Sequence, residues 1–245
     1  MKKPAIFAVF IAYNAEKTLK KFFETFPKHL FDEIILVDDA SQDSTYELAK
    51  SLGIKTYKNE VNLGYGGNMK RALSIGLQLG GDVFVDIHPD GEYLPSSIPA
   101  ALKKVEEGAW FVLGNRFSNM ATPLKSGMYF WKFIPIVGLN LLARLILQTD
   151  IKDLHQGFRV YTRRLLEKNS FENYSNGYLF SIEMIAQAIF NKISIAQVPV
   201  ETRYTGKKRG ARLKHSILYT TGTIKILLFF LAAKVGIKSK IFSAN

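Results

Sequence analysis

The sequence predicts an α/β fold in which a mostly parallel sheet is flanked by helices. Short apolar runs alternate with stretches of helical periodicity from the start of the chain to about residue 114, and such alternation is typical of a parallel sheet covered on both faces. Two of the apolar runs, 33–37 and 82–85, lead directly into acidic residues. Because ligands in open α/β sheets bind beyond the carboxyl ends of the strands, we expect a site at that edge.

The predicted elements follow one another in a regular order. Strands are expected near residues 5–11, 33–38, 54–57, 82–86 and 109–113, and helices near residues 15–26, 43–51, 67–79 and 96–107. The first apolar run reaches the polar Tyr13-Asn14 without a cleavage pattern of small residues, so we interpret it as a strand and not as a signal peptide. The second helix is signalled by Asp43-Ser44-Thr45 and the fourth by Pro95-Ser96.

Composition limits the classes of function. With 245 residues, of which 47% are hydrophobic, the chain can bury one sizeable core. It contains no cysteine, which excludes disulfides, thiolate metal sites and cysteine nucleophiles. The net charge is +12, and no acidic residue follows Glu201, so a basic C-terminal region is expected to seek an anionic partner. Nucleic acid, acidic lipid headgroups and a phosphorylated substrate all fit that description.

Two long apolar stretches lie in the second half of the chain. The stretch Met128–Leu147 is interrupted by Pro135 and Gly138, and the segment 108–149 contains no Asp or Glu. We favour a helix, continuous or broken, that lies in a membrane interface over 128–148; a buried core helix is the alternative. The stretch Ile217–Ile237 follows a basic cluster, which is typical of adsorption to an anionic membrane surface, although a helix packed on the sheet is also consistent.

Three side chains after the fourth predicted strand have the chemistry of a metal site. His88, Asp90 and Glu92 occupy alternate positions, so in an extended segment all three would project to one side. Two carboxylates and an imidazole can bind Mg²⁺ or Mn²⁺, with substrate phosphates completing the coordination. A polar turn is the alternative, because Pro and Asp-Gly are ordinary turn residues.

A glycine-rich run precedes the third predicted helix. It reads Asn62-Leu63-Gly64-Tyr65-Gly66-Gly67-Asn68-Met69-Lys70-Arg71. Backbone amides at the start of a helix, followed by two basic residues, suit a diphosphate or a ribose. The run is neither a P-loop nor a complete dinucleotide fingerprint, so its signal is weak alone.

Taken in order, six short motifs resemble those of the family 2 glycosyltransferases, which have the GT-A fold. They are Ala12-Tyr13-Asn14, Val37-Asp38-Asp39-Ala40-Ser41-Gln42-Asp43-Ser44-Thr45, Asn62-Leu63-Gly64-Tyr65-Gly66-Gly67, His88-Pro89-Asp90-Gly91-Glu92-Tyr93, Gly114-Asn115-Arg116-Phe117 and Asp153-Leu154-His155-Gln156-Gly157-Phe158-Arg159. The resemblance covers roughly residues 4–214 and is nearest to the dolichyl- and polyprenyl-phosphate mannosyl- and glucosyltransferases. It implies a GT-A domain over 1–214, to which residues 215–245 add a basic amphipathic helix that associates with a membrane.

The resemblance also implies roles for individual residues. Donor binding is implied for Ala12, Tyr13, Asn14, Asp38, Asp39, Gly66, Lys70, His88 and Pro89, and metal binding for His88, Asp90 and Glu92. The chain departs from the family pattern where His88 replaces the first carboxylate of the metal motif, a role that Asp86 could take over, and where Ile11 replaces a proline. These departures bear on the choice of metal and nucleotide base more than on the fold.

The remaining implied roles concern the acceptor. If it is a lipid phosphate, it is already largely ionised at pH 7 and needs no general base. Cations must then hold two phosphates together: the metal on the donor, and Arg116, Arg159 and Arg209 on the acceptor. A hydroxyl acceptor would instead need a base, for which Asp153 and Asp150 are candidates, as is His155. We expect Asp90, Arg116 and Asp153 to be the catalytic residues, and the family analogy implies inversion at the anomeric carbon.

The expected function is therefore transfer of a hexose from a UDP- or GDP-linked sugar to a polyprenyl or dolichyl phosphate. The enzyme would act peripherally at the cytoplasmic face of an anionic membrane, with Mg²⁺ or Mn²⁺. A glycosyltransferase acting on a saccharide or glycolipid hydroxyl is the second hypothesis. A basic nucleic-acid-binding protein is a third, but we expect no nucleic-acid partner, because the chain has no zinc, RNP or basic-zipper signature. A catalytically inactive relative is a fourth hypothesis, suggested by His88.

Overall fold

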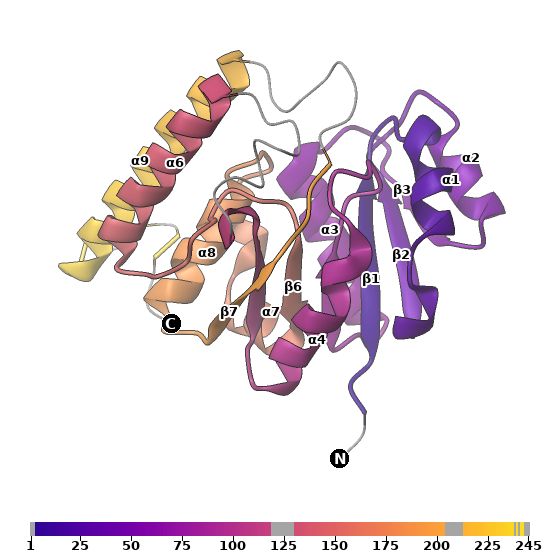
Figure 1. The fold of residues 1–245 in the computed structure, drawn as a ribbon, viewed down its shortest axis with the longest axis horizontal. Coiled ribbons are helices and arrows are strands. Elements are labelled where there is room, and N and C mark those ends of the chain that lie inside the picture. Colours follow the sequence, from indigo (N-terminus) through magenta and orange to yellow (C-terminus); the bar gives the residue numbers. More distant parts are fainter. Residues whose placement is uncertain (1–2, 119–129, 204–212, 238, 240, 243–245) are drawn as a thin grey trace.

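A computed structural model of the chain describes residues 3–118, 130–203, 213–237, 239 and 241–242. Its centre is one seven-stranded sheet with the strand order β3-β2-β1-β4-β6-β5-β7 (Figure 1). The strands are β1 (Ile6–Ala12), β2 (Glu33–Asp38), β3 (Lys55–Lys58), β4 (Val83–Asp86), β5 (Phe111–Asn115), β6 (Arg159–Thr162) and β7 (Ile195–Pro199). All neighbouring strands are parallel except β6, which runs antiparallel to both β4 and β5. The mostly parallel α/β fold expected from the sequence is confirmed.

Helices cover both faces of this sheet. They are α1 (Glu16–Glu24), α2 (Thr45–Ser51), α3 (Gly64–Gln78), α4 (Ile98–Glu106), α6 (Phe130–Leu147), α7 (Arg163–Lys168), α8 (Phe180–Phe190) and α9 (Leu213–Lys234). Five strands and four helices predicted up to residue 114 are present, with ends that differ by up to three residues. Helix α6 occupies most of the expected segment 128–148 without a break, although Pro135 lies inside it.

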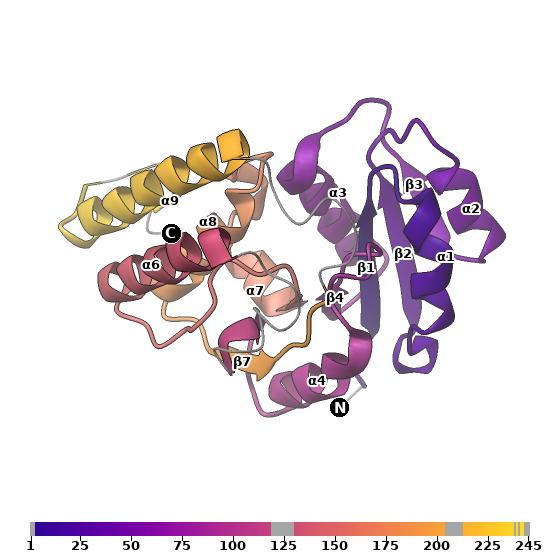
Figure 2. The same cartoon turned by 45° about the horizontal axis from the view of Figure 1, so that its top comes forward.

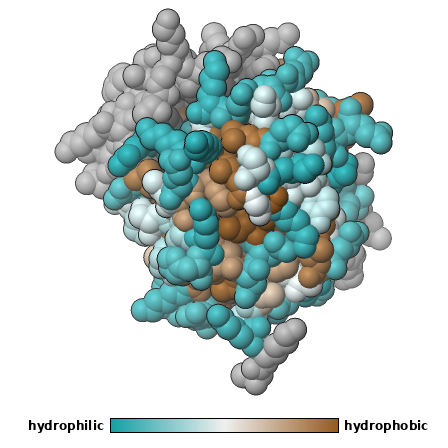
Figure 3. Space-filling view, turned by 90° about the vertical axis from the view of Figure 1, so that its right-hand side faces the viewer, coloured by the Kyte–Doolittle hydropathy of each residue, from teal (hydrophilic) through white to brown (hydrophobic). Residues whose placement is uncertain are grey.

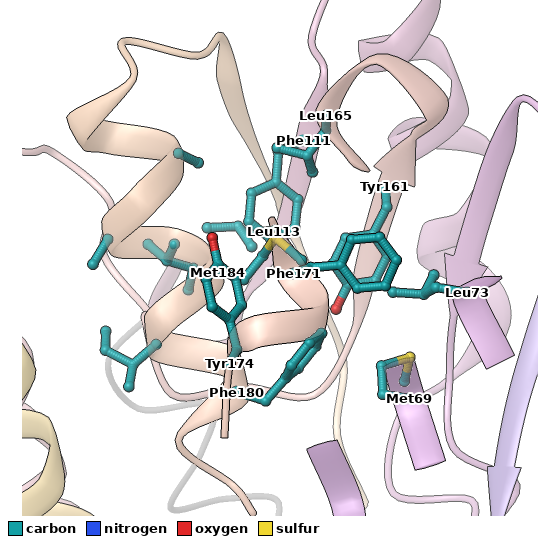
Figure 4. Close-up of a cluster of buried hydrophobic side chains, with 14 of the residues drawn as sticks. Met69, Leu73, Phe111, Leu113, Tyr161, Leu165, Phe171, Tyr174, Phe180 and Met184 are labelled. Carbon is teal, nitrogen blue, oxygen red and sulfur yellow. The ribbon is translucent and has the colours of Figure 1, made fainter. Parts of the chain in front are cut away.

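The core is split by the sheet into two apolar layers. One layer lies beneath α1, α2 and α4 and is rich in aromatic rings; Phe10, for example, meets Phe22 and Phe26 edge to face. The other lies beneath α3, α7, α8 and α9, where Phe111 stacks on Tyr161 at a centroid distance of 5.2 Å (Figure 4). Because the central strands are buried on both faces, they read as continuous apolar runs.

Helices α6 and α9 stand side by side beyond one end of the sheet (Figures 1 and 2). Each buries one side, α6 through Asn140 and Ala143 and α9 through Ile226 and Phe230. Their other sides expose large apolar residues: Ile134, Leu141, Leu142 and Leu145 on α6, and Ile217, Leu218, Ile224, Leu228, Phe229 and Leu231 on α9. We call these ten side chains the apolar face.

At the opposite end of the molecule, viewed from the side of α1 and α2, hydrophobic residues gather near the middle of the surface and hydrophilic residues surround them (Figure 3). Exposed apolar side chains scattered singly are normal for a folded protein, whereas an extended apolar face needs an explanation.

Candidate active site

The candidate site lies along the edge at which the parallel strands end, at the top of Figure 1. Strands β1 and β2 are paired so that Ala12 lies opposite Asp38, and β4 ends at Asp86 on the other side of β1. The register therefore aligns the ends of β1 and β2, whereas the last residue of β4 pairs with Val9, three residues before the end of β1. Both acidic clusters predicted from the sequence reach this edge.

The loop after β1 is fixed to the loop after β2. The backbone N–H of Asn14 donates to Ser41 Oγ at 2.8 Å, and Asn14 Oδ1 accepts from the backbone N–H of Gln42 at 2.9 Å. Asn14 has a φ of 54°, a conformation that Asn tolerates better than most residues. Tyr13, which precedes Asn14, has half of its surface exposed. Its ring is available to a planar ligand such as a nucleotide base.

The two adjacent carboxylates after β2 have different surroundings. Asp39 is buried and accepts from Asn59 Nδ2 at 2.7 Å and from the backbone N–H groups of Leu63 and Gly64 at 2.8 and 3.0 Å. It therefore fixes the start of α3 to the end of β2. Asp38 is equally buried, yet only its Oδ2 is bonded, to the backbone N–H of Ser41, and its Oδ1 has no partner among the described residues. Of the pair, Asp38 is the one with a side-chain oxygen, itself buried, that has no partner among the described residues.

The glycine-rich run is used by the chain itself. The amides of Gly66 and Gly67 both donate to the carbonyl of Asn176, and a Cβ at Gly66 would lie 2.3 Å from the carbonyl oxygen of Ser175. Lys70 donates to the carbonyls of Glu172 and Tyr174 at 3.2 and 2.8 Å. These contacts join Gly66 and Lys70 to the loop 172–177, and their contact with a diphosphate stays a prediction.

The predicted metal motif does not form an extended segment. The chain turns at Asp90-Gly91, where Gly91 has a φ of 75° and Asp90 Oδ1 accepts from the backbone N–H of Glu92 at 2.9 Å. His88, Asp90 and Glu92 therefore do not project to one side as alternation suggested. Asp90 is exposed and His88 and Glu92 are partly exposed, whereas Pro89 is buried beneath them.

Asp86 lies directly below His88. It is fully buried, and its Oδ1 is 3.6 Å from His88 Nε2; neither of these two atoms has a hydrogen-bond partner among the described residues. Burial raises the pKa of Asp86 to about 6, against the opposing effects of His88 and Arg159. Arg159 is its register partner on β6. A buried carboxylate next to a partly exposed imidazole is an arrangement that orients a histidine.

The described residues contain no group of three His, Asp or Glu side chains close enough to hold a metal ion. Asp90 and His88 nevertheless present a carboxylate and an imidazole at the open side of the strand edge. Mg²⁺ is often bound by only one or two protein ligands, with phosphates and water completing its coordination. The residues present fit a metal of that kind, in which a diphosphate supplies the missing oxygens.

Arg116 and Asp153 form a buried ion pair at the end of β5. Arg116 Nε lies 2.7 Å from Asp153 Oδ2 and Arg116 Nη2 lies 3.0 Å from Asp153 Oδ1, and the backbone N–H of Arg116 also donates to Oδ2. Burial alone would raise the pKa of Asp153, but the charge and hydrogen bonds of Arg116 outweigh this effect and hold the pKa below its ordinary value. Such a carboxylate is a weak proton acceptor.

The other predicted acceptor residues are placed as follows. Arg159 is buried, donates from Nη1 to the Tyr65 hydroxyl at 3.0 Å and contacts the carbonyl of Gln156, while its Nε has no partner among the described residues. Asp150, the alternative base, is exposed. Arg209 lies outside the described residues.

Three aromatic or histidine side chains near this edge were not assigned a firm role from the sequence. Tyr65 stacks on the exposed Tyr178 at a centroid distance of 5.4 Å and contacts His88 at 5.6 Å. His155 Nδ1 is 2.8 Å from the hydroxyl of Tyr219 on α9. Tyr65 and Tyr219 lie in helices whose periodicity predicts packing, so no local signal distinguishes them from core residues.

Comparison with protein families gives one match that spans most of the chain. The model described as "Glycosyl transferase family 2" matches residues 8–170. A UDP-N-acetylglucosamine–dolichyl-phosphate N-acetylglucosaminyltransferase of Methanococcus voltae is 28% identical over 224 residues, covering 84% of this chain and 88% of that protein. A polyprenol monophosphomannose synthase of Mycolicibacterium smegmatis is 29% identical over 177 residues, covering 68% of this chain and 65% of that protein.

Solved structures show the same fold. The glucosyl-3-phosphoglycerate synthase of Mycobacterium tuberculosis in complex with UDP superposes with a TM-score of 0.70 at 22% identity, covering 93% of this chain and 80% of that one. Its complex with Mn²⁺, UDP and glucosyl-3-phosphoglycerate also gives a TM-score of 0.70, with 96% of this chain covered and 81% of that one. At this level of identity the likeness concerns the fold.

Proposed function

The chain belongs to glycosyl transferase family 2 and is a glycosyltransferase, and on that premise we propose that it transfers a hexose from a UDP- or GDP-linked sugar to the phosphate of a polyprenyl or dolichyl lipid. The names of two relatives support this acceptor class. The transfer is a single displacement with inversion: an acceptor phosphate oxygen bonds to the anomeric carbon as the bond to the nucleoside diphosphate breaks.

The observation on which the choice of acceptor depends is the Arg116–Asp153 pair. A hydroxyl nucleophile needs a base, but both oxygens of Asp153 accept hydrogen bonds from Arg116 and its pKa is held low. A phosphomonoester needs no base, because its second pKa is about 6 and it is mostly dianionic at pH 7. The electrostatics near β5 therefore favour a phosphate acceptor.

The donor half of the site would lie at the ends of β1, β2 and β4. Tyr13 offers an exposed ring to the base, and the unbonded Oδ1 of Asp38 can accept from a base N–H or a ribose hydroxyl. Asp90 and His88 would hold Mg²⁺ or Mn²⁺, with Glu92 nearby. When bound, the metal neutralises the charge that develops on the leaving diphosphate.

One assay tests this proposal. The protein is incubated with radiolabelled UDP-glucose, UDP-N-acetylglucosamine or GDP-mannose, Mn²⁺ or Mg²⁺, and either undecaprenyl phosphate or undecaprenol. We expect a lipid-linked label with the phosphate and none with the alcohol. Label on the alcohol alone would favour the hydroxyl-acceptor hypothesis. No label with any donor would contradict the proposal. Asp153→Asn cannot make this distinction, because it also breaks the buried pair.

We propose further that the apolar face of α6 and α9 adsorbs to the cytoplasmic surface of a membrane. Among the described helices, one, over 216–234, is long and apolar enough to cross a bilayer, and only 22% of that window is buried inside the protein. A core helix would be mostly buried. Lys225 and Lys234 are exposed on the same helix, and the chain has a net charge of +12. Cations beside an apolar face suit anionic headgroups.

Co-sedimentation with vesicles tests the membrane proposal. The wild-type protein should bind vesicles containing phosphatidylglycerol more strongly than vesicles of phosphatidylcholine alone. Leu141→Lys combined with Leu145→Lys should weaken binding, because two charges would enter the apolar region. Leu79→Lys, at an exposed apolar residue of the sheet domain, is the matched control. Equal binding by all variants would contradict adsorption through this face.

A further inference from the structure

A hydrogen bond joins the C-terminal helix to the candidate site. The hydroxyl of Tyr219, on α9, lies 2.8 Å from His155 Nδ1, and the two rings meet edge to face at 5.4 Å and 85°. The residues are 64 positions apart, so only the tertiary packing of α9 makes this contact. A polar contact from a helix that is otherwise mostly apolar indicates a specific role for Tyr219.

His155 is in turn bonded to the buried ion pair. Its backbone carbonyl accepts from Arg116 Nη2 at 3.1 Å, and its backbone N–H lies 3.4 Å from Asp153 Oδ1. Arg116 therefore holds both Asp153 and the backbone of His155. Tyr219, His155 and Arg116 form a continuous chain of contacts from α9 to the end of β5.

The second ring nitrogen of His155 differs from Nδ1 in its surroundings. Nε2 of His155 is buried and has no hydrogen-bond partner among the described residues. Burial lowers the pKa of His155 to about 4, so the ring is neutral near pH 7 and has one donor and one acceptor nitrogen. A tyrosine hydroxyl can donate to Nδ1 or accept from it, so this bond is compatible with both neutral tautomers, and the tautomer present sets what Nε2 offers to a ligand.

The position of α9 next to Tyr219 is closely defined. A Cβ at Gly222, one turn further along the helix, would lie 2.5 Å from Leu179 Cδ1. A larger residue at 222 would therefore require either the Leu179 side chain or α9 to shift. A small displacement of α9 would therefore also displace the hydroxyl of Tyr219 from His155.

We propose that Tyr219 is a positioning residue which, through His155, makes the geometry of the acceptor half of the site depend on the seating of α9. The inference rests on the proposed function, and it takes the region around Arg116, at the end of β5, as the acceptor half of the site. Because α9 also provides much of the apolar face, binding of that helix to a membrane would at the same time align the residues of the acceptor half.

Tyr219→Phe removes only the hydroxyl and is the first test. We expect kcat/KM for the lipid phosphate to fall about tenfold, the effect of losing one buried hydrogen bond, while donor KM and vesicle binding stay unchanged. Tyr46→Phe on α2 is the matched control, because Tyr46 contacts Lys50 and Lys58 through its ring. An unchanged acceptor kcat/KM in Tyr219→Phe would overturn the proposal.

A double-mutant cycle tests whether Tyr219 acts through His155. In a His155→Ala background, Tyr219→Phe should have no further effect on acceptor kcat/KM. Fully additive losses would overturn the proposal, because they would mean that the two side chains act independently.

One readout does not depend on transferase activity. The chain has four histidines, so the imidazole resonances can be assigned by substitution. The His155 ring should become protonated only well below pH 6, and near pH 7 it should be present as a single neutral tautomer. Tyr219→Phe should shift the resonances of the His155 ring nitrogens, while those of His29 stay unchanged. An unaltered His155 spectrum would overturn the inference. If no donor gives a lipid-linked product, the proposed function fails, and this spectrum still decides whether α9 controls His155.

Discussion

Arg116 and Asp153 are held together by two side-chain hydrogen bonds of 2.7 and 3.0 Å, and the carboxylate is completely buried. The backbone N–H of Arg116 adds a third bond to the same carboxylate. The geometry is bidentate, which is the strongest arrangement of a guanidinium and a carboxylate. Two residues expected from the sequence to act on substrate thus satisfy one another.

Single substitutions in this pair should be more destabilising than the double substitution. Asp153→Asn or Arg116→Met leaves one buried charge without its partner, which typically costs about 3 to 5 kcal/mol of unfolding free energy. Arg116→Met combined with Asp153→Leu removes both charges and should recover much of that loss. Urea unfolding of the three variants measures this coupling. A double variant as unstable as the sum of the singles would show that the two charges are not coupled.

The pair also predicts a dependence of stability on pH. The pKa of Asp153 is lowered in the folded protein, so its stabilisation is fully present above its ordinary value of 3.8 and is lost as pH falls through the lowered folded value. Wild-type protein should therefore lose more stability below pH 4 than the Arg116→Met/Asp153→Leu variant. Thermal unfolding from pH 2 to 7 tests this. Parallel curves for the two proteins would be inconsistent with a lowered pKa at Asp153.

Substitutions of the two adjacent carboxylates after β2 should have different effects, one on stability and the other on nucleotide binding. Asp39→Ala leaves Asn59 and two backbone amides without their acceptor and should lower the unfolding free energy by about 2 to 4 kcal/mol. Asp38→Asn should change stability by less than about 1 kcal/mol but weaken nucleotide binding roughly tenfold, because Oδ1 is the atom left for a ligand. Urea unfolding and calorimetric titration with UDP and GDP measure the two effects. If Asp38→Asn lowered stability and Asp39→Ala mainly weakened nucleotide binding, the two residues would have the opposite roles to those expected here.

Much of the fold could be predicted because its signals are local. Apolar runs and helical periodicity located the first five strands and four helices, and the acidic residues expected at the carboxyl ends of β2 and β4 lie there. The insertion of β6 between β4 and β5, antiparallel to both, has no such signal. Strand order depends on long-range pairing, which the pattern within one strand does not report.

The details of the site were harder to predict for the same reason. The partner of Lys70 is a pair of carbonyls more than 100 residues away, and that of Asp153 is 37 residues away. The geometry assigned to His88, Asp90 and Glu92 assumed an extended strand, whereas the chain turns at Gly91. Residue type gave the chemistry, and tertiary contacts decided which atoms remain available to a ligand.

Removal of divalent metal should abolish transfer, and substitutions at Asp90 and His88 should show which of these residues bind the metal. Treatment with EDTA should eliminate the lipid-linked product, and Mn²⁺ or Mg²⁺ should restore it. Asp90→Asn should weaken the metal dependence of UDP or GDP binding at least tenfold, since it removes the exposed carboxylate at the turn. His88→Ala should have a smaller effect, because a neutral imidazole contributes less to binding a hard cation than a carboxylate does.

Calorimetric titration of nucleotide with and without Mn²⁺ measures that dependence without relying on turnover. Glu107→Gln, which changes an exposed carboxylate paired with Lys104 on another part of the surface, is the matched control and should behave as wild type. If Asp90→Asn binds nucleotide as tightly as wild type in the presence of Mn²⁺, Asp90 is not a metal ligand. In that case Asp86, which lies beneath His88, is the next carboxylate to test. Loss of the Mn²⁺ dependence of nucleotide binding in Asp86→Asn would identify the buried carboxylate as the group that binds the ion.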